Sequence, residues 1–75
     1  MDAEQCRMAR ASLKWTLDDL AKASGLGRAT LARFELGQPV SDETIEKAKA
    51  ALEVQRVRFI DKGPFKGGIS RMKAG

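Results

Sequence analysis

The amino-acid sequence predicts an all-α domain of four helices, followed by a short β-strand or hairpin. Two observations lead to this fold class. Apolar residues recur every three or four positions in four segments of the first 53 residues, which is the spacing of helices with one buried face. After residue 53 the pattern changes to a β-branched run and then to glycine-rich breakers. We therefore divide the chain into a helical domain, residues 1–53, and a C-terminal extension, residues 54–75.

The first helix is expected from Ala3 to Leu13, with Cys6 and Ala9 on its inner face. Arg10 interrupts this apolar stripe with a charge. Such an arginine either extends its guanidinium to solvent or pairs with a buried acid. Cys6 is expected to be a small core residue, because nothing near it in the sequence would lower the pKa of its thiol.

Residues 16–36 have the layout helix, tight turn, helix. Thr16 is a natural N-cap, two aspartates follow in the first turn, and Gly25 supplies a left-handed residue that ends the helix. Only two residues separate Gly25 from the next periodic run, Arg28 to Leu36, so the two helices must cross steeply. The inner stripe of this run consists of Leu31, Phe34 and Glu35, and the outer stripe of Arg28, Ala29, Ala32 and Arg33.

A fourth helix is expected to begin at a Ser41 cap, with Val40 and Ile45 packed together across its start. In the extension, residues 57–60 favour a strand, residues 61–68 are rich in turn residues, and residues 69–72 could return as a second strand. The alternative is a strand followed by a disordered basic tail. The apolar residues expected to meet a second copy or another partner are Val57, Phe59 and Ile60.

Composition excludes several classes of protein. The chain has 75 residues, no histidine and one cysteine, so it can form neither an internal disulfide nor a Cys/His metal cluster, and a reducing compartment is expected. No apolar run is long enough to span a bilayer. The first 53 residues carry eight basic and nine acidic side chains, whereas the last 22 carry six basic and one acidic, which gives the net charge of +4. The extension could therefore attract phosphates without regard to sequence.

Residues 6–52 resemble the phage repressor and Cro-like (Xre-type) helix-turn-helix family. The resemblance rests on Leu20, Ala21, Gly25, Thr30, Leu31, Arg33, Glu35 and Gly37. It implies a compact four-helix domain in which the helix of residues 28–36 enters the major groove of double-stranded DNA. It also implies a structural ion pair between Arg10 and Glu35. The chain departs from the family at Leu17, where glutamine is common, and at Gly27, where the N-cap is usually a hydroxyl residue.

Docking geometry then assigns expected roles to individual residues. The N-terminal part of a reading helix meets base edges, where arginine matches guanine O6 and N7 and small alanines admit thymine methyls. The expected base contacts are Arg28, Ala29, Ala32 and Arg33. The expected phosphate contacts are Lys14, the backbone at Leu17, Thr30, Gln38 and Ser41. The competing interpretation is that the two arginines are only a solvated face.

The expected function is that of a sequence-specific DNA-binding transcriptional regulator. We expect a cytoplasmic, nucleoid-associated repressor that binds a near-palindromic operator as a homodimer, with no cofactor, metal or small-molecule effector. The alternative is an antitoxin or adaptor that uses its C-terminal strand to bind a protein partner. An enzyme is not expected, because the chain lacks His and Tyr and its paired acidic residues lie where helix N-termini explain them.

Overall fold

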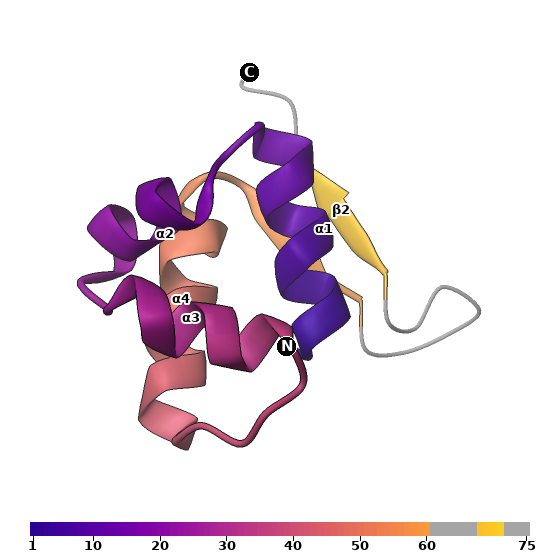
Figure 1. Ribbon diagram of the computed structural model, residues 1–75. Coiled ribbons are helices and arrows are strands. Elements are labelled where there is room, and N and C mark those ends of the chain that lie inside the picture. The colour runs from indigo at the N-terminus through magenta and orange to yellow at the C-terminus, as the bar shows by residue number, and fades with distance from the viewer. Residues whose placement is uncertain (61–67, 72–75) are drawn as a thin grey trace.

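The computed structural model describes residues 1–60 and 68–71. Within them, the helices are α1 (Ala3–Leu13), α2 (Leu17–Ser24), α3 (Arg28–Glu35) and α4 (Asp42–Val54). Two antiparallel strands follow, β1 (Val57–Phe59) and β2 (Ile69–Arg71). In Figure 1, α3 lies across the front of α4, and β2 lies beside α1. The predicted fold class, four helices followed by a short hairpin, is confirmed.

Capping interactions define where the helices begin. The Thr16 hydroxyl accepts the Asp19 backbone N–H at 3.1 Å, and the Asp19 carboxylate accepts the Thr16 N–H at 2.9 Å. At the start of α4 the Ser41 hydroxyl accepts the Thr44 backbone N–H, whereas Gly27 offers α3 no side-chain cap. Gly25 has a φ of +74°, so it ends α2 in the left-handed conformation that the sequence predicted.

The core lies where the four helices and β1 meet. Its largest fully buried side chains are Leu20, Leu31, Leu52, Val57 and Cys6. Cys6 is thus the core residue that the sequence predicted. The prediction for Val57 was wrong, because its side chain is only 1% exposed and cannot form part of a partner surface. Alternation along β1 turns Val57 inward and Arg58 outward, and leaves Phe59 half-buried.

Besides the packing of Val57 in the core, a buried polar side chain of α1 hydrogen-bonds the hairpin to the helices. Gln5 donates from Nε2 to the carbonyl oxygens of Gly68, at 3.1 Å, and Ile60, at 3.4 Å. Its Oε1 accepts the backbone N–H of Asp2, so the same amide also caps α1. An isolated two-stranded hairpin is marginal in water, and these contacts supply the support that it needs. Most of the predicted turn, residues 61–67, lies outside the described residues.

Candidate nucleic-acid interface

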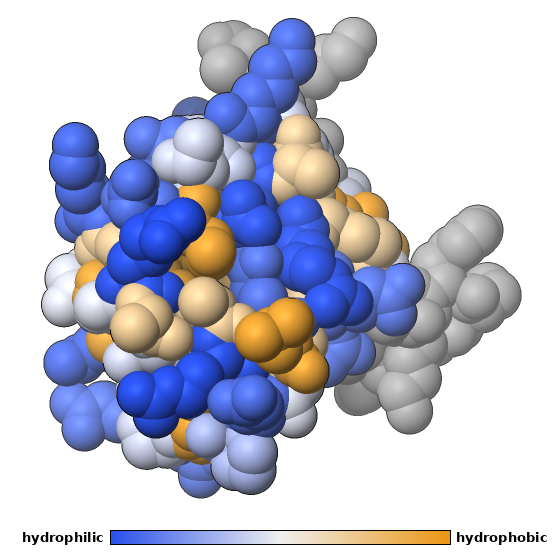
Figure 2. All heavy atoms as spheres, in the orientation of Figure 1, coloured by the Kyte–Doolittle hydropathy of each residue, from blue (hydrophilic) through white to orange (hydrophobic). Residues whose placement is uncertain are grey.

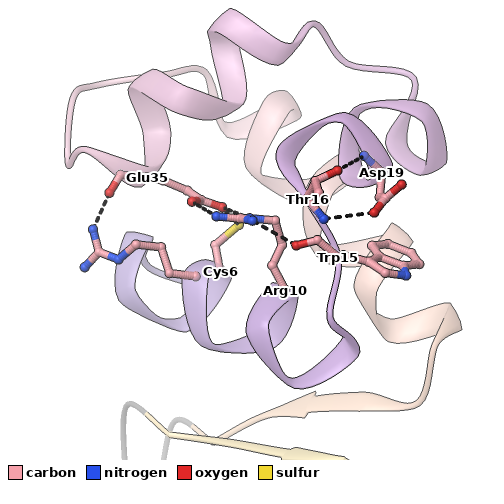
Figure 3. Close-up of polar contacts among 7 residues, drawn as sticks. Cys6, Arg10, Trp15, Thr16, Asp19 and Glu35 are labelled. Atoms are coloured by element: carbon pink, nitrogen blue, oxygen red, sulfur yellow. Dashed lines mark hydrogen bonds and ion pairs between the residues drawn. The ribbon is translucent and has the colours of Figure 1, made fainter.

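An ion pair ties the inner face of α3 to α1. Arg10 donates from Nε and Nη2 to the two carboxylate oxygens of Glu35, each at 2.6 Å. Glu35 is buried and the Arg10 side chain is 20% exposed. The third nitrogen, Nη1, donates to the backbone oxygen of Trp15 at 3.0 Å, just before α2 (Figure 3). The pair implied by the family resemblance is therefore present, and one guanidinium joins three segments of the helical domain.

Two further α1 residues contact Glu35, and neither contact was predicted from the sequence. Arg7 donates to the backbone oxygen of Glu35, at the C-terminal end of α3. The Cys6 thiol lies 3.4 Å from Oε2 of the same side chain (Figure 3). The available signal for Arg7 was its spacing, because a residue three positions before Arg10 lies on the same side of the helix. The end of α3 is thus held through both its side chain and its backbone.

The environment of Cys6 keeps its thiol protonated. Burial raises its pKa from 9.0 to about 12, and the negative charge of Glu35 and the hydrogen bond to it act in the same direction. The Glu35 hydrogen bond likewise raises the pKa of Arg10, against the effect of burial. The cluster therefore holds a neutral thiol beside a charged pair.

Native Cys6 is expected to resist alkylation by iodoacetamide at pH 8, because the thiolate is the reactive form and the side chain is buried. Since the pKa is higher in the folded state, the thiol's contribution to stability is fully present below pH 9 and is lost as pH rises toward 12. Mass spectrometry of the alkylated protein with and without urea, and melting temperature against pH, measure both effects. Equal labelling rates in native and unfolded protein would contradict this prediction, and Cys6→Ala is the control for the alkaline loss.

The outer face of α3 presents the four predicted base-contact residues together. Arg28, Ala29 and Arg33 are exposed and Ala32 is half-exposed, whereas the opposite face of the helix is buried. Leu36 continues this outer face and is 75% exposed. Beside it lies an open hollow of about 250 Å³, lined by Arg7, Leu17, Ala32, Glu35 and Leu36. Figure 2 shows the corresponding surface, with hydrophobic spheres among strongly hydrophilic ones.

Arg28 contacts one of the two aspartates in the first turn of α2, and this contact was not predicted from the sequence. Its Nε lies 3.1 Å from Oδ1 of Asp18, in the first turn of α2. Both side chains remain about two-thirds exposed, at 66% for Arg28 and 68% for Asp18. Arg33 forms no ion pair with any of the described residues. The two arginines of the outer face therefore differ in how firmly they are held.

The five predicted phosphate contacts lie in different settings. Lys14, Gln38 and Ser41 are exposed, and Leu17 and Thr30 are half-buried. The Ser41 hydroxyl already accepts the Thr44 backbone N–H at 3.2 Å as a helix cap. At the start of α2, hydrogen bonding to the Thr16 backbone lowers the pKa of Asp19, so this carboxylate is ionised at neutral pH.

Comparison with protein families identifies the family of this fold. The helix-turn-helix family model matches residues 7–59, which runs from α1 to the last residue of β1. A search of the curated proteins found no match.

Among the described residues, no helix is long and apolar enough to cross a membrane, and no group of three acidic, Cys or His side chains could hold a metal ion.

Proposed function

Because this chain belongs to the helix-turn-helix family, a family of DNA-binding transcription regulators, we propose that it acts as a repressor. It binds a near-palindromic operator as a homodimer and represses by occupying the promoter. The observation that carries the proposal is the two-sided character of α3. Its inner face is fastened by Glu35, and its outer face carries two exposed arginines separated by alanines.

In the proposed complex, α3 lies in the major groove with its outer face toward the bases. Arg28 and Arg33 each contact a guanine, because an arginine fork matches the O6 and N7 acceptors. Ala29 and Ala32 allow close approach and touch thymine methyl groups. The Arg10–Glu35 ion pair makes this reading precise, since it fixes α3 relative to the rest of the domain.

Phosphate contacts hold the domain in register on the duplex. We assign them to Lys14, the backbone N–H of Leu17, Thr30, Gln38 and Ser41. The first 53 residues have a net charge of −1, so their overall charge does not attract DNA. The attraction of this part of the chain to phosphates comes from these individual groups. The six basic residues of the extension add an attraction that is independent of sequence and weakens with salt.

A homodimer follows from the small amount of sequence that one such domain can read. Two reading helices related by a two-fold axis contact half-sites about one helical turn, or roughly 34 Å, apart. Phe59 and Ile60 are the proposed contact residues, because both are partly exposed at the end of β1. Val57 is not among them, since it belongs to the core.

Selection of bound duplexes from a random pool, at a stated salt concentration, tests this function. We expect a palindromic consensus with guanine in each half-site and a centre-to-centre spacing of about 10 base pairs. Sedimentation equilibrium of the complex then gives the number of chains on the DNA. An asymmetric consensus bound by one chain would overturn the homodimer. Failure to enrich any sequence at low salt would overturn specific DNA binding and favour a protein partner instead.

A further inference from the structure

We propose that Asp18 is a positioning residue that sets the base specificity of Arg28. The inference rests on the proposed function, because it concerns how one base-contact residue is aimed. Asp18 takes one edge of the Arg28 guanidinium and leaves the other edge to read guanine. It is thus a specificity determinant that does not itself touch a base.

The geometry of the pair defines what remains available on Arg28. A guanidinium presents five N–H groups in one plane, in a rigid fork. Oδ1 of Asp18 lies 3.1 Å from Nε, and neither terminal Nη nitrogen of Arg28 forms a hydrogen bond with any of the described residues. A bidentate contact to guanine O6 and N7 requires two parallel N–H groups from the same plane. The carboxylate therefore attracts the guanidinium by its charge and contacts it at Nε, while the edge formed by the two Nη groups stays open to a base.

The Asp18–Arg28 ion pair joins two helices, although a lysine within α2 is also placed to pair with Asp18. Lys22 lies four residues after Asp18, which is the favourable spacing for an ion pair along one helix. The carboxylate instead contacts Arg28, the first residue of α3. The neighbouring Asp19 is not equivalent, because its carboxylate is directed to the Thr16 backbone N–H at 2.9 Å. The structure thus gives the two adjacent aspartates different tasks.

An exposed pair of this kind contributes little to folding stability, so its value must be sought in binding. A free arginine side chain samples many rotamers, and it must lose that freedom when it contacts a base. A guanidinium that Asp18 already orients loses less rotamer freedom when it contacts a base. The same carboxylate repels the phosphates of any duplex, so it lowers affinity for random DNA while it favours the matched site. Arg33, with no ion-pair partner among the described residues, lacks this constraint.

The test compares five variants by selection and by titration with the selected duplexes. Arg28→Ala first identifies the base pair that Arg28 reads. Asp18→Ala, alone and combined with Arg28→Ala, then tests the coupling, and Asp18→Asn restores a neutral oxygen acceptor. Asp42→Ala is the matched control, because Asp42 is also an exposed carboxylate in the first turn of a helix, here α4. Circular dichroism checks that each variant is folded.

At the base pair read by Arg28, we expect Asp18→Ala to lower the preference for guanine by about 3- to 10-fold, as for coupled neighbouring residues. Asp18→Asn should retain part of the preference for guanine. In a protein that already carries Arg28→Ala, Asp18→Ala should not change the base preference any further. Both aspartate-to-alanine changes should raise affinity for random duplex, but only the one at Asp18 should alter base preference. The base pair read by Arg33 should be unaffected.

Three outcomes overturn the inference in distinguishable ways. If Arg28→Ala relaxes a base preference and Asp18→Ala does not, Asp18 has no positioning role and the proposed base contact still stands. If Asp42→Ala changes the preference as much as Asp18→Ala does, the effect is one of charge alone. If Arg28→Ala leaves every preference unchanged, the base contact proposed for Arg28 fails together with this inference.

Discussion

Replacing Glu35 with alanine is expected to lower the free energy of unfolding by about 3–5 kcal/mol, the usual effect of removing one partner of a buried ion pair. The change removes the two carboxylate oxygens that accept from the Arg10 guanidinium at 2.6 Å and leaves it only the Trp15 backbone oxygen. It also leaves the Cys6 thiol without the Glu35 carboxylate at 3.4 Å. The charge of Arg10 would then be held among buried groups without compensation. Because a small domain is only marginally stable, this loss should leave much of the protein unfolded.

Urea denaturation followed by circular dichroism measures this loss, and melting should fall by more than about 12 °C. Glu46→Ala is the matched control, since Glu46 is an exposed glutamate of α4 with no ion-pair partner among the described residues. The double change Arg10→Met with Glu35→Leu should recover most of the stability, because an apolar pair needs no compensation. A loss below about 1 kcal/mol in Glu35→Ala would show that the pair is not important for the fold.

Replacing Arg33 with alanine is expected to remove the preference for one base pair in each half-site. The loss should be about 5- to 150-fold per half-site, because a good bidentate contact contributes about 1–3 kcal/mol of discrimination. Arg33 is exposed on the outer face of α3 and forms no ion pair within the described part of the chain. Its removal should therefore leave the stability of the free protein almost unchanged. Titration of the selected duplex and of single-base variants measures the discrimination directly.

The control for Arg33 is substitution by lysine, which keeps the positive charge but lacks the planar fork. Arg33→Lys should retain the affinity for random duplex and its salt dependence while losing most of the base preference. Arg33→Ala should lose the base preference and also bind random duplex more weakly, with a smaller slope of affinity against salt. If the alanine variant selects the same consensus as the natural chain, α3 does not read DNA through this residue.

Local patterns predicted the helices well because each boundary depends on adjacent residues. The expected helix over Ala3–Leu13 is present with those bounds, and Thr16 and Ser41 cap the helices that follow them. Gly25 adopts the left-handed conformation that a short turn demands. Local patterns could not predict the Arg10–Glu35 ion pair, because 25 residues separate its members. The resemblance to the family predicted that the two residues pair.

The features that the sequence did not reveal depend on tertiary placement. Gln5 reads as an ordinary polar residue, yet it is buried because the hairpin folds back onto α1. The contact between Asp18 and Arg28 crosses from one helix to the next, and no spacing rule predicts which carboxylate a long arginine will reach. Val57 was assigned to a surface because a strand pattern does not say which face the helices cover. Whether α3 contacts bases remains a prediction until DNA is bound.

The attachment of α1 to α3 has a consequence for how this regulator could be controlled. Arg7 contacts the backbone of Glu35 and Arg10 its side chain, so contacts at two places resist motion of α1 relative to α3. A signal that tilts one relative to the other would have to break a buried pair, which is a large barrier for a domain of this size. We therefore predict that this domain is not switched by a tilt of α3 against α1.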